Sequence, residues 1–215
     1  MTGQGGGFGT VVVLNGVPRS GKSSIAAALA GSAQGGPWLA FGVEAMAGVT
    51  PAALRPGIGL RPGGERPDLE DAVVVLFDAL YAAVVAWSRA GRNVVVDVGH
   101  HDDYSRPLGV LSTVAAALAD LPAYFVGVRC PVEVIMARRD AGPGRAGGGP
   151  CVTSEPDGSV PAIVRRWERA VHDPGLYDVE VDTSATVPDA CAAAIVRRVR
   201  EGPPVAFGEL ARRRT

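Results

Sequence analysis

The sequence predicts an α/β protein in three layers, with helices on both faces of a five-stranded parallel sheet. Short apolar runs alternate with longer helical patterns along the chain, and this alternation is typical of parallel strands joined by crossover helices. The first apolar run leads directly into a glycine-punctuated loop and an alanine-rich helix. The 215 residues, 47% of them hydrophobic, suffice for one domain with a complete core. We therefore expect a single domain over residues 1–215.

Five short apolar runs are the predicted strands, and six helical patterns lie between and after them. The strands are expected at residues 11–14, 38–43, 92–97, 124–130 and 177–182. The helices are expected at residues 25–30, 69–90, 108–121, 132–139, 162–171 and 190–200. The last strand alternates apolar and acidic residues, so we expect it at an edge of the sheet. Residues 203–215 follow as an appended tail with a basic end.

A P-loop pattern, Gly-x-x-x-x-Gly-Lys-Ser, follows the first predicted strand and opens the first helix. Its glycines let successive backbone N–H groups point into one concavity, and the helix N-terminus adds its positive dipole end there. The pattern therefore predicts a nucleotide phosphate site. The residues expected to form it are Gly16, Val17, Pro18, Arg19, Ser20, Gly21, Lys22, Ser23 and Ser24.

Lys22 is the only lysine in the chain, the other twenty of its 21 basic residues being arginines. We expect its compact ammonium group to reach the β- and γ-phosphates, and the Ser23 hydroxyl to bind Mg²⁺. Asp97 ends the third predicted strand, where a carboxylate can help to hold Mg²⁺ or orient a substrate hydroxyl. The alternative for Asp97 is a polar strand end without a role in catalysis.

Glu44 follows the second predicted strand directly. Ligands of open α/β sheets bind at the carboxyl ends of the strands, so this carboxylate is a candidate for contact with substrate. The alternative is that Glu44 only begins a helix, where an acidic side chain is favoured by the helix dipole.

Two loops are expected to border the same edge. A segment at about residues 138–150, rich in glycine and bearing Arg138 and Arg145, is typical of a lid that closes over a transferring phosphate. For each arginine the alternative is a solvated helix end. Residues 100–103 read His-His-Asp-Asp and predict a substrate-facing loop rather than a metal site, because adjacent loop side chains rarely converge on one ion.

Several functional classes are disfavoured. A GTPase needs an Asn-Lys-x-Asp element, which a chain with a single lysine at position 22 cannot contain, and no LSGGQ-type transporter signature is present. A net charge of −1 argues against nucleic acid or a membrane as the main partner. We expect no signal peptide and no membrane span, and three cysteines without metal-type spacing favour a reducing, cytoplasmic location. A small-molecule kinase remains.

Four runs extend this expectation to a family. They are LNGVPRSGKSS, WLAFGVE, FVGVRC and YDVEVDT, in this order within residues 11–200. Together they resemble the chloramphenicol phosphotransferase family. The resemblance implies a P-loop kinase fold and transfer of the γ-phosphate of ATP, with Mg²⁺, to a primary hydroxyl of chloramphenicol.

The resemblance also implies roles for individual residues. The general base corresponds to Glu44, where the family has aspartate, and Thr183 with its neighbours borders the adenine. Arg138 and Arg145 match the lid arginines, whereas an intervening arginine of the family falls on Gly142. The expected partner is a hydroxylated small molecule, and a homo-oligomer is possible. Two alternatives stay open: a kinase for another antibiotic or metabolite, and a nucleotide-binding regulator without turnover.

Overall fold

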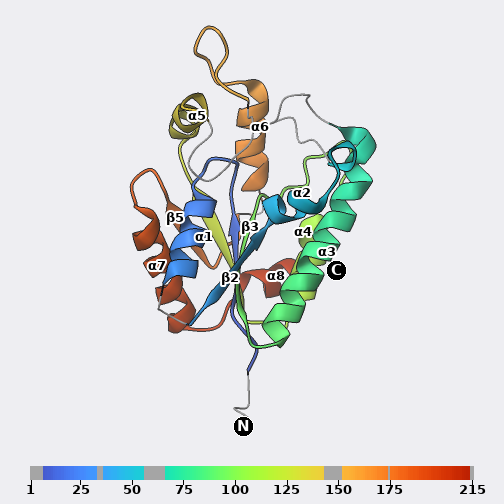
Figure 1. Ribbon diagram of the computed structural model, residues 1–215, viewed down its shortest axis with the longest axis vertical. Helices are drawn as coiled ribbons and strands as arrows, with labels where there is room; N and C mark the ends of the chain where they lie inside the picture. Colours follow the sequence, from blue (N-terminus) through green and yellow to red (C-terminus); the bar gives the residue numbers. More distant parts are fainter. Residues whose placement is uncertain (1–6, 33–35, 56–65, 143–151, 174, 214–215) are drawn as a thin grey trace.

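The computed structural model describes residues 7–32, 36–55, 66–142, 152–173 and 175–213, and it confirms the predicted three layers (Figure 1). The strands are β1 Val11–Asn15, β2 Trp38–Gly42, β3 Asn93–Val98, β4 Ala123–Arg129 and β5 Val179–Asp182. They form one sheet in the order β2-β3-β1-β4-β5, and every neighbouring pair is parallel. β5 lies at an edge, as its acidic alternation predicted.

Burial on both faces explains the apolar runs. Val11 and Val13 of β1 pack into one face of the sheet, while Val12 and Leu14 pack into the other. All four side chains are buried, which is why β1 reads as a continuous apolar run rather than an alternating one. The central position of β1 places the loop that follows it at the middle of the carboxyl edge, where the chain direction across the sheet reverses.

Helices cover both faces of the sheet. They are α1 Lys22–Gly31, α2 Val43–Val49, α3 Glu70–Arg89, α4 Val110–Leu118, α5 Val132–Asp140, α6 Ala162–Val171, α7 Pro188–Glu201 and α8 Ala206–Arg212. α1 and α7 pack on one face, and α3, α4 and α8 pack on the other (Figure 1). α5 and α6 pack on each other beyond the carboxyl ends of the strands. Within the described residues, none of the helices is both long and apolar enough to span a bilayer.

The C-terminal segment is part of the core, so the expected appended tail is wrong for the residues that the structure describes. α8 packs against α4 and β4, and its residues Ala206 and Phe207 are buried. The ring of Phe207 lies 4.9 Å from the ring of Phe125, measured between centroids. The segment is too short to show a clear helical periodicity in the sequence, so its burial could be recognised only from the surface of α4 and β4 on which it packs.

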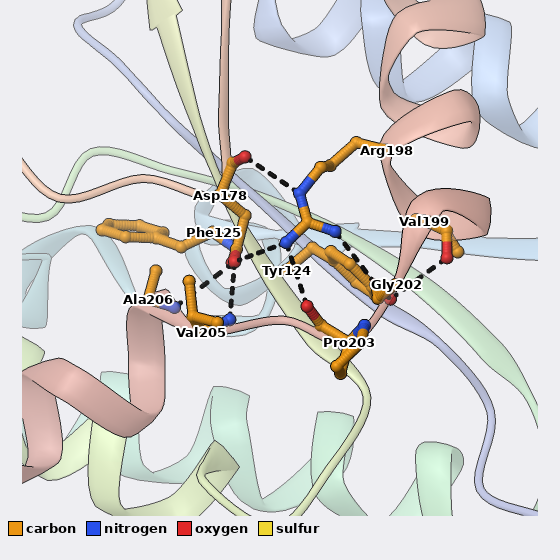
Figure 2. Close-up of polar contacts among 9 residues, drawn as sticks. All are labelled: Tyr124, Phe125, Asp178, Arg198, Val199, Gly202, Pro203, Val205 and Ala206. Carbon is orange, nitrogen blue, oxygen red and sulfur yellow. Dashed lines mark hydrogen bonds and ion pairs between the residues drawn. The ribbon is translucent and has the colours of Figure 1, made fainter.

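A buried carboxylate anchors α8 (Figure 2). Asp178 Oδ1 accepts a hydrogen bond from the backbone N–H of Val205 at 2.7 Å, and Oδ2 accepts one from Phe125 N–H at 2.9 Å. Arg198 Nη2 lies 3.4 Å from Asp178 Oδ1, and Arg198 Nη1 donates to the Gly202 carbonyl at 2.9 Å. The carboxylate thus holds the start of α8 against β4, and its charge is matched by Arg198.

Candidate active site

The P-loop conformation requires two of its glycines. A Cβ atom at Gly16 would lie 2.6 Å from the Val128 carbonyl oxygen, and Gly21 has a φ of 97° with Thr183 packed against it. Gly21 caps α1 without a side-chain hydrogen bond, so the N–H groups of the first turn of α1 are available to an anion. Ser20 Oγ is buried and lacks a hydrogen-bond partner among the described residues. This arrangement fits a bound phosphate group.

Lys22 places a buried ammonium group within the loop. Its Nζ donates to the Val17 carbonyl at 2.9 Å and lies 3.6 Å from Asp97 Oδ1. Burial lowers the pKa of Lys22, and the negative charges of Asp97 and Glu44 act in the opposite direction. The structure therefore brings the predicted lysine and both predicted carboxylates into one electrostatic site.

Ser23 and Asp97 lie together as predicted for a metal site. Ser23 Oγ donates to Asp97 Oδ2 at 2.5 Å. A hydroxyl and a carboxylate are hard oxygen ligands suited to Mg²⁺, which keeps several waters and takes only one or two protein carboxylates. The described part of the chain holds no cluster of three or more His, Cys, Asp or Glu side chains that could bind an ion alone. Ser24, next along α1, is exposed.

Glu44 lies in the first turn of α2, one residue beyond the Gly42–Val43 junction of β2 and α2. It is therefore both a residue at a strand's carboxyl end and the start of a helix, so the two alternatives are compatible. Gly42 pairs with Asp97 in the sheet, and a Cβ atom there would lie 2.5 Å from the Asp97 carbonyl oxygen. This close approach brings the start of α2 beside β3. Glu44 itself is exposed to solvent.

The histidines after β3 are buried, so these side chains do not make the loop substrate-facing. His100 Nε2 lies 2.7 Å from the hydroxyl of Tyr81, and the ring of His101 packs edge-on against Trp167 at 3.6 Å between centroids. Burial lowers the pKa of both histidines to about 3, and both are neutral at pH 7. Asp103 forms an ion pair with Arg166.

Asn15 is a positioning residue that the sequence analysis missed. Its side chain is fully buried, donates to the Val171 carbonyl and to the Tyr177 hydroxyl, and accepts from the His100 N–H at 2.6 Å. It thus joins the end of β1 to the loop after β3 and to the segment after α6. A polar residue at the end of a buried strand, directly before the P-loop glycine, was the signal that could have identified it.

Arg138 and Thr183 lie at the P-loop. Arg138 Nη1 donates to the Arg19 carbonyl at 3.2 Å and to Thr183 Oγ1 at 3.1 Å, and Nη2 donates to the Thr183 carbonyl at 2.8 Å. Thr183 Oγ1 donates to the Ser20 carbonyl at 2.6 Å. The lid role of Arg138 and the adenine contact of Thr183 remain predictions, and Arg145 lies outside the described residues.

Comparison with solved structures shows the fold. A sugar kinase of Janibacter sp. HTCC2649 superposes with a TM-score of 0.59 at 17% identity, covering 94% of this chain and 98% of that one. The tunicamycin resistance protein of Deinococcus radiodurans gives a TM-score of 0.55 at 18% identity, with coverages of 91% and 98%. The APS kinase of Mycobacterium tuberculosis gives 0.56 at 14%, with coverages of 90% and 99%. The chain therefore has a P-loop kinase fold.

Sequence comparison identifies the family. No curated protein sequence matches the chain. The family model for chloramphenicol phosphotransferase-like proteins matches residues 9–200, which include every described site residue discussed above. The match agrees with the resemblance carried by the WLAFGVE and YDVEVDT runs. Together, the family match and the fold support an ATP-dependent phosphotransferase. The chain belongs to the chloramphenicol phosphotransferase-like family.

Proposed function

We propose that this protein transfers the γ-phosphate of ATP to a hydroxyl group of a small antibiotic, with chloramphenicol as the first candidate acceptor. The observation that carries the proposal is the convergence of Lys22, Ser23 and Asp97 at the P-loop, with Glu44 acting electrostatically on the same lysine. A site that only binds nucleotide has no need for a second carboxylate there. The proposal places the enzyme in the cytoplasm, where ATP is available.

ATP supplies the phosphoryl group, and Mg²⁺ offsets its negative charge. Lys22 contributes a positive charge within the loop, and the uncapped N-terminus of α1 contributes backbone N–H donors. Ser23 Oγ and the Asp97 carboxylate are the oxygen ligands available to the ion. Phosphoryl transfer depends mainly on such positioning and charge stabilisation, so these parts are suited to the proposed reaction.

Glu44 is assigned the role of general base. The acceptor oxygen forms a bond to the γ-phosphorus as the bond from that phosphorus to the bridging oxygen of ADP breaks, and Glu44 takes the proton of the acceptor hydroxyl. Glu44 is exposed at the carboxyl edge, so an acceptor can reach it from solvent. Because glutamate is one methylene longer than the family's aspartate, the acceptor must sit slightly differently or be a different alcohol.

The test is a panel of hydroxylated antibiotics, including chloramphenicol, incubated with the protein and ATP·Mg²⁺ and analysed by mass spectrometry. We expect chloramphenicol heavier by one phosphate. Phosphorylation of another antibiotic alone would keep the reaction and replace the acceptor. If neither the antibiotics nor hydroxylated metabolites stimulate release of ADP, the protein is a nucleotide-binding regulator and the proposed function is wrong.

A further inference from the structure

The hydroxyl of Thr183 is shared between the P-loop and a neighbouring arginine. A hydroxyl has one proton to donate, and the shortest contact, 2.6 Å, directs it to the Ser20 carbonyl. The lone pairs then accept from Arg138 Nη1 at 3.1 Å. The methyl group of Thr183 would lie 3.1 Å from a Cβ atom at Gly21, so the side chain also packs on the loop. Thr183 therefore touches the P-loop through both of its branches.

Arg138 donates hydrogen bonds both to the P-loop and to Thr183. Its planar group reaches three oxygen acceptors at once, namely the carbonyls of Arg19 and Thr183 and the Thr183 hydroxyl, and Nη1 also lies 3.4 Å from Cys130 Sγ. A guanidinium can do this because its donors are arranged in a fixed fork, whereas an ammonium cannot span the same acceptors. Arg138 thus ties the end of α5 and the segment after β5 to the same stretch of loop.

The loop needs such a tie. Arg19 has a φ of 75°, the only non-glycine residue of the described chain with a positive φ. The left-handed conformation is unfavourable for a residue with a Cβ atom and persists only where surrounding contacts hold it. When N–H groups of a P-loop turn inward to form an anion site, the carbonyls of the same peptides turn outward and need donors. Arg138 and Thr183 supply donors to the carbonyls of Arg19 and Ser20.

We propose that Arg138 and Thr183 act as one clamp that holds the P-loop in its phosphate-binding shape before the nucleotide arrives. The inference rests on the proposed function, because it assumes that the P-loop binds the phosphates of ATP. It does not depend on which acceptor is phosphorylated. Both residues are positioning residues in this account. A role of Arg138 as a charge that stabilises the transferring phosphoryl group makes different predictions, because it would not involve Thr183.

The test compares Thr183→Val, Thr183→Ser, Arg138→Lys and the double variant Thr183→Val with Arg138→Lys. Binding of MgADP is measured by calorimetry, and hydrogen exchange of the P-loop amides is measured without ligand. Loss of these hydrogen bonds should weaken MgADP binding about tenfold in Thr183→Val and in Arg138→Lys. P-loop exchange should become faster in both. Thr183→Ser keeps the hydroxyl and should restore both properties.

The double variant decides whether the two residues form one unit. A clamp predicts that it binds MgADP about as weakly as either single variant, because each substitution already disables the tie. It also predicts a raised KM for ATP in each variant, in step with the weaker binding of MgADP. Thr113→Val and Arg200→Lys, at exposed positions of α4 and α7, are the matched controls and should bind like wild type.

Three results would overturn the clamp. These are wild-type MgADP binding in Thr183→Val, strictly additive losses in the double variant, and a fall in kcat without a change in MgADP binding in Arg138→Lys. Melting curves of every variant show whether weaker binding reflects unfolding, and Thr183→Ser keeps the test valid if Thr183→Val fails to fold. If wild-type protein itself does not bind MgADP, the proposed function fails instead, so the two failures are distinguishable.

Discussion

Two clusters in this protein each combine one carboxylate with one cation, and they differ in what else the carboxylate contacts. The side chain of Asp178 is 0% exposed, and its oxygens accept from backbone N–H groups of β4 and of the α8 start, as well as facing Arg198. The side chain of Asp97 is 19% exposed, next to buried Lys22 and the hydroxyl of exposed Ser23. The first cluster is enclosed by protein groups, whereas the second is partly open to solvent.

The difference separates stability from function. A carboxylate whose partners are all protein groups stabilises one arrangement of the chain. Removing it leaves those partners without an acceptor and lowers the free energy of unfolding. A lysine buried beside a partly open carboxylate carries a desolvation penalty that a bound phosphate would offset. We therefore expect substitutions at Asp178 to change folding, and substitutions at Lys22 to change activity.

The largest expected effect is on activity at Lys22. Lys22→Ala should abolish ATP-dependent phosphorylation, and Lys22→Arg should lose most of it, because a planar fork does not replace a compact charge in a tight loop. Product formation followed by mass spectrometry measures both, with melting temperature as the control for folding. Wild-type activity in Lys22→Arg would show that the loop does not hold phosphate as described.

At Asp178 the comparison predicts the opposite outcome. Asp178→Ala leaves Arg198 without its carboxylate and frees the start of α8, which should lower the free energy of unfolding by about 3 kcal/mol. Denaturant titration measures this loss. Glu201→Ala, which removes the carboxylate of an exposed pair with Arg197, is the matched control and should change stability by less than about 0.5 kcal/mol. Equal losses in the two variants would contradict the structural role.

Substitution of Glu44 tests whether this exposed carboxylate near Lys22 acts as the general base. Glu44→Gln should keep ATP binding and lower kcat more than about 100-fold, the lower range for loss of a general base. Glu44→Asp restores the residue of the family with a shorter reach, and it should retain partial activity on the native acceptor. If Glu44→Gln raises the KM for the acceptor and leaves kcat within a few-fold, Glu44 only binds the acceptor.

The smallest effect concerns His100, a buried histidine whose Nε2 contacts the Tyr81 hydroxyl. Burial lowers its pKa from 6.5 to about 3, so the unfolded chain binds more protons between these pH values. Stability should therefore fall as pH decreases from about 6.5, by about 2 kcal/mol at pH 5 from this residue. His100→Gln should remove that part of the pH dependence in denaturant titrations. His172→Gln should remove a similar part at pH 5, because a pKa lowered to about 4 already leaves His172 almost neutral there. An unchanged pH profile in His100→Gln would contradict the buried neutral state.

Sequence reasoning reached the strands, the P-loop and the family because these are encoded locally. Glycines at fixed spacing, with a lysine and a serine after them, define the loop without knowledge of distant residues. Two other features depend on surfaces brought together by folding. Arg138 was expected in a lid, which stays a prediction, and its hydrogen bonds to the P-loop and to Thr183 depend on how α5 packs against α6 and the P-loop. Phe207 is buried because α8 packs against α4 and β4. The sequence of its own segment does not indicate this packing.

The central claim is that the Lys22–Asp97 cluster transfers phosphate to an alcohol. The most direct measurement counts ADP released and acceptor phosphorylated in the same reaction, with and without chloramphenicol or the active member of the antibiotic panel, for wild type and Lys22→Ala. We expect one ADP for each phosphorylated acceptor, a rate that rises with acceptor concentration, and neither product in Lys22→Ala. Release of ADP at one rate regardless of acceptor, with no phosphorylated product, would contradict the claim.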